Sequence, residues 1–196
     1  MAVKAVVFDL GETLIDERRH WGVVAEAAGV EPERMWAALE DVAARRAHHS
    51  RVFDDLGVEQ PAVDDEWQAS DLYPDAVPSL TRIRDRGYLV GVAANQWAHA
   101  DEFCRRLFPF DLIGISALWG VEKPAPEFFA RVTASLPCRA EEIAYVGDRA
   151  DNDVEPALAA GMVAVHLKRG PWGRAHETPS GAIAIASLDE LPAVLE

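Results

Sequence analysis

Residues 3–15 read VKAVVFDLGETLI. The run before Asp9 is apolar and rich in valine, and Gly11 follows at a position that favours a turn. This pattern predicts a buried strand over residues 3–9 that ends at Asp9. Since open α/β sheets bind ligands at the carboxyl ends of their strands, Asp9 is the first candidate for a functional side chain.

Similar apolar runs recur along the chain and alternate with helical patterns. We expect further strands at residues 88–94, 111–115, 143–147, 162–167 and, as a last short strand, 182–185. We expect helices at residues 74–86, 125–136 and 152–160, and a final helix opened by a capping box of Ser187 and Glu190. This alternation predicts the α/β class, with a Rossmann-like parallel sheet and helices on both faces.

Residues 16–73 interrupt the alternation. They contain helical segments around 18–28, 32–48 and 64–71 but no strand-like run, and Met35, Leu39 and Val42 would share one helix face. An all-helical insertion after the first strand predicts a small cap over the active edge. Residues 1–15 and 74–196 would then form the α/β core and residues 16–73 the cap. Residues 168–181 are rich in glycine and proline and predict a surface loop.

Composition and charge narrow the class of protein. A chain of 196 residues with 49% apolar and 27% charged residues has room for one core and a small inserted module. The net charge of −14 argues against binding to nucleic acid or an anionic membrane. No apolar run is long enough to cross a bilayer, and the amino terminus lacks a signal-peptide layout, so we expect a cytoplasmic protein. The two cysteines, Cys104 and Cys138, have no metal-type spacing and are expected to be buried or half-buried thiols in a reducing compartment.

Four polar segments each lie at the end of a predicted strand. They are residues 9–13 (DLGET), 92–95 (VAAN), 120–129 (GVEKPAPEFF) and 145–153 (YVGDRADND). In a parallel sheet all four would lie along one edge.

The chain resembles the haloacid dehalogenase-like hydrolase superfamily over nearly its full length. The resemblance depends on KPAPEFF at residues 123–129 and GDRADND at residues 147–153, which are specific when they occur together in this order. The Leu72-Tyr73-Pro74 lead-in is also similar to phosphatase-type members with a helical cap near the amino terminus. The resemblance implies a core of five parallel strands, a cap inserted after the first strand, and an aspartate nucleophile.

The same resemblance implies a role for each residue of the four segments. Asp9 would attack phosphorus and form an aspartyl-phosphate, which divides one hydrolysis into two steps. Asp9, the backbone carbonyl of Gly11 and Asp148 would bind Mg²⁺, with Asp153 as a further ligand or as support for the others. Lys123 would neutralise the Asp9 carboxylate and hold a phosphate oxygen. Asn95 would contact the phosphate, although it could instead only cap a helix.

Two positions depart from the family's pattern. Family phosphatases generally have a second Asp at the position of Gly11, which acts as acid and base, and a Ser or Thr at the position of Ala94. We therefore ask which residue replaces the acid–base group, and rank Glu12 first. An exposed charge at the hinge is an equally good interpretation of Glu12. The other candidates at the predicted hinge are Asp16, Glu17 and His20.

These observations favour a Mg²⁺-dependent phosphatase of a small phosphorylated metabolite. Gly11 and Ala94 keep open a binding or regulatory protein with weak or no turnover. A 2-haloacid dehalogenase is less favoured, because such enzymes need no metal and lack the carboxylate-rich GDRADND form. Trp21 and Trp36 could face the cleft from the cap. Nothing in the sequence identifies the metabolite or the oligomeric state.

Overall fold

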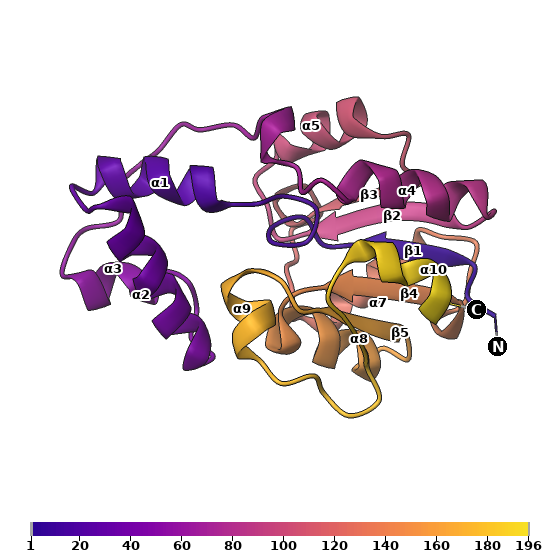
Figure 1. Ribbon diagram of the computed structural model, residues 1–196. Helices are drawn as coiled ribbons and strands as arrows, with labels where there is room; N and C mark the ends of the chain where they lie inside the picture. The colour runs from indigo at the N-terminus through magenta and orange to yellow at the C-terminus, as the bar shows by residue number, and fades with distance from the viewer. Residues whose placement is uncertain (1, 196) are drawn as a thin grey trace.

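The computed structural model describes residues 2–195 and contains a six-stranded, all-parallel sheet in the order β3-β2-β1-β4-β5-β6 (Figure 1). The strands are β1 (Ala5–Phe8), β2 (Leu89–Ala94), β3 (Leu112–Ile115), β4 (Ile143–Gly147), β5 (Val163–Leu167) and β6 (Ile183–Ile185). The predicted Rossmann-like α/β fold and all its predicted strands are confirmed. The last strand joins the sheet, which therefore has one strand more than the family resemblance implied.

Both faces of the sheet are covered because the strands alternate their side chains. Val6 and Phe8 of β1 pack into one core, and Ala5 and Val7 into another. The helices on the first face are α4 (Ala76–Asp85), α5 (Ala100–Leu107) and α10 (Leu191–Val194). Those on the second are α7 (Pro126–Ala134) and α8 (Glu155–Ala159). The predicted capping box before α10 is present, with Ser187 accepting a hydrogen bond from the Asp189 backbone.

Between β1 and α4 the described chain contains helices but no strand of the sheet. These are α1 (Arg18–Ala27), α2 (Pro32–Ala44) and α3 (Arg51–Leu56), shown in indigo and purple in Figure 1, followed by a single 3₁₀ turn at Ala69–Asp71. We call residues 16–73 the helical segment. Met35, Leu39 and Val42 lie together in its own small core, as their spacing predicted. That the segment is a separate cap domain stays a prediction.

The predicted helix at residues 64–71 is wrong. Only its end forms a helical turn, because Asp65 and Asp71 instead accept hydrogen bonds from the Arg19 guanidinium. These ion pairs tie the extended chain back onto α1. The prediction also missed α3 and extended α2 beyond its end at Ala44.

The predicted surface loop at residues 168–181 is also wrong in part. It contains the short helix α9 (Gly170–Ala175), which begins with Pro171 in its first turn and packs against α2. Trp172 is buried in the core of the helical segment. Glycine and proline at the start of this stretch indicated a loop, but tertiary burial of the tryptophan decides its structure.

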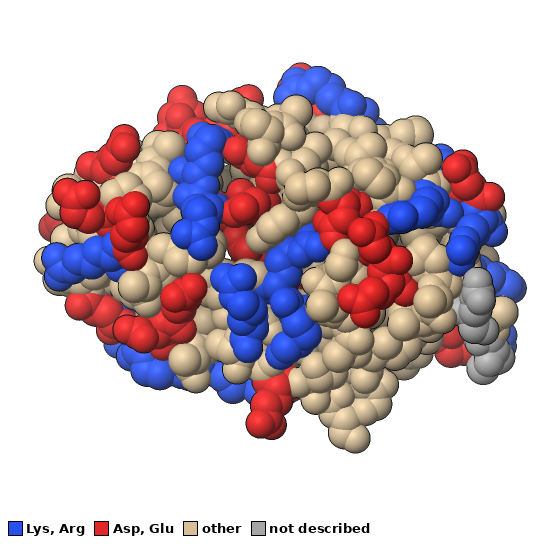
Figure 2. Space-filling view, viewed as in Figure 1, with Lys and Arg blue, Asp and Glu red and all other residues tan. Residues whose placement is uncertain are grey.

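The surface agrees with the acidic composition. On the face shown in Figure 2, acidic and basic side chains are interspersed. Among the helices in the described residues, none has the length and apolarity to cross a membrane.

Candidate active site

A pocket of about 980 Å³ lies between the carboxyl edge of the sheet and the helical segment. The sheet side contributes Asp9, Lys123 and Asp148, which follow or lie near the ends of β1, β3 and β4. The helical segment contributes Trp21 and Phe53 from the opposite wall. The structure therefore brings the four predicted polar segments to one edge, as a parallel sheet requires.

Lys123 is the centre of this edge. Its Nζ lies 2.7 Å from Asp9 Oδ1 and 2.6 Å from Asp153 Oδ1, and all three side chains are buried. The other oxygen of Asp153 accepts a hydrogen bond of 2.9 Å from the Arg149 backbone. Burial alone would lower the pKa of Lys123, but the adjoining Asp153 and Asp9 carboxylates hold it well above its usual range. The Lys123 side chain therefore stays protonated and positively charged.

The single positive charge of Lys123 does not neutralise the three carboxylates around it. Oxygens of Asp9, Asp148 and Asp153 lie within 4.8 Å of one another. Burial raises the pKa of Asp9 to about 6, with Lys123 opposing the rise and Asp153 adding to it. Burial, with Asp153 and Asp9 nearby, also raises the pKa of Asp148 well above its usual range. Asp148 is 2% exposed, so its carboxylate is almost fully removed from water. Such hard oxygen donors in negative excess fit a divalent cation such as Mg²⁺.

A turn of the backbone after β4 places the Asp153 side chain in this cluster. Residues Ala150–Val154 form one π-helical turn after β4. The turn brings the Asp153 carboxyl against Gly147, where an added Cβ would lie 2.4 Å from the Asp153 Cγ. Only glycine at this strand end leaves room for the carboxylate, which explains the glycine that opens the GDRADND segment.

Asn95 contacts the lysine loop through its side chain. Its Nδ2 donates to the Lys123 carbonyl at 2.9 Å, and the Lys123 backbone N–H donates to Asn95 Oδ1 at 2.7 Å. The sequence indicated a phosphate contact for this side chain. In the structure both ends of the amide hold the loop that carries Lys123, a positioning role that the sequence pattern did not suggest. The phosphate contact of Asn95 stays a prediction.

Glu12 is buried and held in the left-handed region, at a φ of 51°. Its Oε2 accepts a hydrogen bond of 2.6 Å from the Tyr73 hydroxyl, and its Oε1 one of 3.0 Å from the Glu17 backbone. Burial raises its pKa to about 6, against the effect of the Tyr73 hydrogen bond. Both oxygens thus connect β1 to the two ends of the helical segment, and the expectation of an exposed hinge charge is wrong.

Glu17 lies against Gly11. A Cβ added to Gly11 would meet Glu17 Oε1 at 2.6 Å and Cδ at 2.8 Å. Burial raises the pKa of Glu17 to about 8, and the Glu12 and Asp9 carboxylates add to the rise. Of the other hinge candidates, Asp16 accepts a hydrogen bond from the Arg18 backbone at 3.0 Å. His20 lines the pocket and pairs with Asp65 at 2.9 Å.

The tryptophans divide between pocket and core. Trp21 lines the pocket, as considered from the sequence, whereas Trp36 is buried within the helical segment. Trp97 and Trp172 also line the pocket, although neither was among the sequence candidates. Trp97 lies three residues after the end of β2 and is 54% exposed, an exposure that only the fold reveals.

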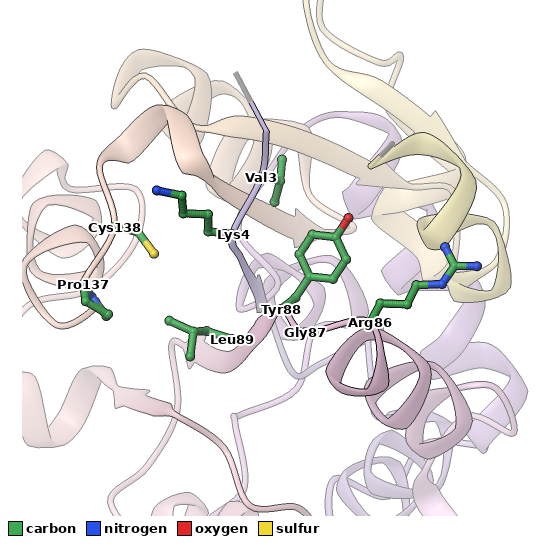
Figure 3. Close-up of a pocket in the computed structure, with 8 residues that line it drawn as sticks. All are labelled: Val3, Lys4, Arg86, Gly87, Tyr88, Leu89, Pro137 and Cys138. Atoms are coloured by element: carbon green, nitrogen blue, oxygen red, sulfur yellow. The ribbon is translucent and has the colours of Figure 1, made fainter.

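A second pocket of about 470 Å³ lies at the opposite, amino edge of the sheet (Figure 3). Val3, Lys4, Tyr88 and Leu89 line it at the starts of β1 and β2. Lys4 pairs with Glu142 at 2.7 Å. This pocket contains none of the clustered carboxylates and has no arrangement suited to catalysis.

Comparison with known proteins agrees with this geometry. A sequence model of the haloacid dehalogenase-like hydrolases matches residues 3–161. The chain belongs to that family. It is 32% identical to a glyceraldehyde 3-phosphate phosphatase of Methanopyrus kandleri over 87% of this chain and 86% of the relative.

Solved structures of haloacid dehalogenase-like proteins share the fold. A phosphatase of the family from Thermococcus onnurineus superposes with a TM-score of 0.66 at 23% identity, covering 98% of both chains. A 2-haloacid dehalogenase from Pseudomonas syringae pv. Tomato superposes with a TM-score of 0.61, also at 23% identity and covering 98% of both chains. The fold alone therefore does not separate a phosphatase from a dehalogenase, and the distinction depends on the site.

Proposed function

We propose that this hydrolase is a Mg²⁺-dependent phosphatase of a small phosphorylated metabolite that reacts through an aspartyl-phosphate on Asp9. The observation that carries the proposal is the buried lysine bridge between Asp9 and Asp153, with the buried Asp148 carboxylate beside it. The name of the Methanopyrus kandleri relative supports a phosphate ester as the substrate.

Each residue of the cluster has a distinct task in this mechanism. Lys123 holds Asp9 Oδ1, so that the second oxygen of Asp9 is available to attack phosphorus. The ammonium group also offsets negative charge on the transferring phosphoryl group. Asp153 holds Lys123 from the other side, and Asn95 holds the backbone of the same loop.

Asp9, Asp148 and the Gly11 carbonyl would hold the cation. When bound, Mg²⁺ supplies positive charge that neutralises phosphate oxygens and orients the ester for in-line attack. Both oxygens of Asp153 already have protein partners, so we assign Asp153 to support of Lys123 ahead of direct ligation.

The two alternatives fit the site less well. A metal-free dehalogenase needs one carboxylate nucleophile and gains nothing from two more buried carboxylates, whose desolvation is costly. A purely regulatory protein has no need for a lysine buried between two of them. Gly11 and Ala94 are the observations that favour such a protein, and the following test includes it.

The test is a panel of phosphorylated metabolites, with glyceraldehyde 3-phosphate included, and 2-chloropropionate, each with and without Mg²⁺. We expect phosphate release that requires both Mg²⁺ and Asp9, and that Asp9→Asn abolishes. Glu122→Gln, an exposed change on the same pocket rim, is the matched control and should stay active. Chloride release without metal would identify a dehalogenase. Mg²⁺ binding without any turnover would identify a regulatory protein.

A further inference from the structure

We propose that Glu17 is the general acid–base of the reaction, and that its carboxyl group acts from the space a side chain at position 11 would occupy. The inference rests on the proposed phosphatase function. It assigns a catalytic role to a residue that lies outside the four strand-end segments.

The first observation is the contact at Gly11. With the Glu17 carboxyl 2.6 Å from the place of a Gly11 Cβ, the two positions share one volume beside Asp9. A residue with any side chain at position 11 would displace Glu17, and Gly11 therefore makes room for it. The absence of a side chain at Gly11 and the position of the Glu17 carboxyl group therefore depend on each other.

The second observation is how α1 presents Glu17. This residue lies immediately before the first turn of α1, where a side chain often caps the helix, yet it makes no capping hydrogen bond. Its carboxyl group instead lines the pocket, and so does Trp21, one helical turn later. The start of α1 thus presents the Glu17 carboxyl group to the pocket rather than to the helix end.

The third observation is the engagement of the other carboxyl groups on the pocket wall, apart from the exposed Glu122 on its rim. Glu12 has both oxygens bonded to Tyr73 and the Glu17 backbone, and Asp151 pairs with Arg149. The carboxylates of the lysine cluster hold Lys123 or would hold the cation. Glu17 is the half-buried carboxyl group of this pocket that none of these tasks occupies.

The proposed steps balance. In the first, the Asp9–phosphorus bond forms while the bond from phosphorus to the ester oxygen breaks, and the Glu17 carboxylic acid gives its proton to that leaving oxygen. In the second, the Glu17 carboxylate takes a proton from water as the water oxygen attacks phosphorus. The Asp9–phosphorus bond then breaks, which releases phosphate and restores both residues.

The decisive variant is Glu17→Gln, which keeps the size of the side chain but cannot transfer a proton. Glycerol 3-phosphate has a poor leaving group and 4-nitrophenyl phosphate a good one. With glycerol 3-phosphate and Mg²⁺ we expect kcat to fall by about 10²–10⁴. With 4-nitrophenyl phosphate we expect one rapid equivalent of nitrophenol and then slow turnover. In intact-protein mass spectra the variant should then carry one phosphoryl group, because its second step has lost the base.

The matched control is Glu26→Gln, an exposed change on the same helix, which should turn over both substrates at the wild-type rate. Wild-type rates for Glu17→Gln on both substrates would overturn the assignment. An equal loss on both substrates without phosphoryl-enzyme would also overturn it, since that result describes a structural role. A wild-type protein that hydrolyses neither substrate would contradict the phosphatase function itself.

A second variant tests the shared volume directly. Glu17→Ala combined with Gly11→Asp places a carboxyl group in the same space from the other side. We expect the double variant to regain at least about tenfold in kcat over Glu17→Ala alone. A folded double variant with no gain would contradict the idea that the two positions are interchangeable sources of one proton-transfer group.

Discussion

At the scale of single residues, the site depends on glycines that make room for carboxyl groups. Gly147 admits Asp153, and Gly11 admits Glu17. Neither carboxylate would reach its place beside a larger residue, so the two glycines are as necessary to the proposed chemistry as the charged groups.

The Gly147→Ala variant tests this dependence. A methyl group 2.4 Å from Asp153 Cγ must displace the carboxylate, and Lys123 with it. A misplacement of this kind can lower kcat about a hundredfold. Steady-state kinetics should show this loss for Gly147→Ala and none for Gly22→Ala, because nothing lies within 4 Å of a Cβ at Gly22. Full activity of a folded Gly147→Ala protein would mean that Asp153 has no role in holding the lysine.

At the scale of elements, the strands and the polar groups at their ends could be predicted from sequence. Apolar runs bounded by glycine fixed β1, β4 and β5 to within two residues, because burial on both faces leaves an unmistakable pattern. Asp9, Lys123, Asp148 and Asp153 follow from the same pattern, since parallel strands bring their ends together.

What could not be predicted depends on contacts between distant segments. The chain at residues 64–68 is extended because Arg19 binds Asp65, and α9 forms where Trp172 is buried against the helical segment. Glu17 could be named as a candidate, but its approach to Gly11 depends on where α1 begins. No local pattern contains that information.

The buried Trp172 side chain, which holds α9 against the helical segment, gives a prediction at the scale of elements. Trp172→Ala should cost about 3–5 kcal/mol of unfolding free energy, because the large buried ring leaves a cavity between α9 and the helical segment. Urea unfolding measures this loss. Trp97→Ala is the control, since Trp97 is exposed and should change stability little. Equal stabilities of the two variants would show that α9 does not anchor the segment.

The amino edge gives a pH-dependent prediction. The Lys4 ammonium, with the Arg139 backbone N–H, lowers the pKa of Glu142 from 4.5 to about 2. The unfolded chain therefore binds this proton more readily than the folded one, so the interaction stabilises the fold above about pH 4.5 and is lost as the pH falls toward 2. Glu142→Gln should lower the urea midpoint at neutral pH and approach the wild type in acid. A difference independent of pH would contradict this assignment.

At the scale of the whole molecule, an acidic chain of net charge −14 concentrates buried carboxylates at one edge of its sheet. Their mutual repulsion lowers the stability of the metal-free protein and favours binding of a divalent cation. The fold thus carries an electrostatic cost that the bound cation would offset.

Thermal unfolding should measure both the destabilising repulsion between the carboxylates and the stabilisation by a bound cation. Mg²⁺ at a hundred times its dissociation constant should stabilise the wild type by about 2.7 kcal/mol. Asp148→Asn should raise the melting temperature of the metal-free protein, because it removes a buried charge, and should respond less to Mg²⁺. A melting temperature of the wild type that Mg²⁺ leaves unchanged would exclude a cation site at these carboxylates.

The central claim is that Asp9 carries the phosphoryl group during turnover. The most direct measurement is rapid acid quenching of the Mg²⁺-loaded enzyme during hydrolysis of 4-nitrophenyl phosphate, followed by mass spectrometry of its peptides. We predict one phosphoryl group on the peptide that contains Asp9, and none in Asp9→Asn. Undiminished hydrolysis by Asp9→Asn, or a phosphoryl group on another residue, would contradict the account.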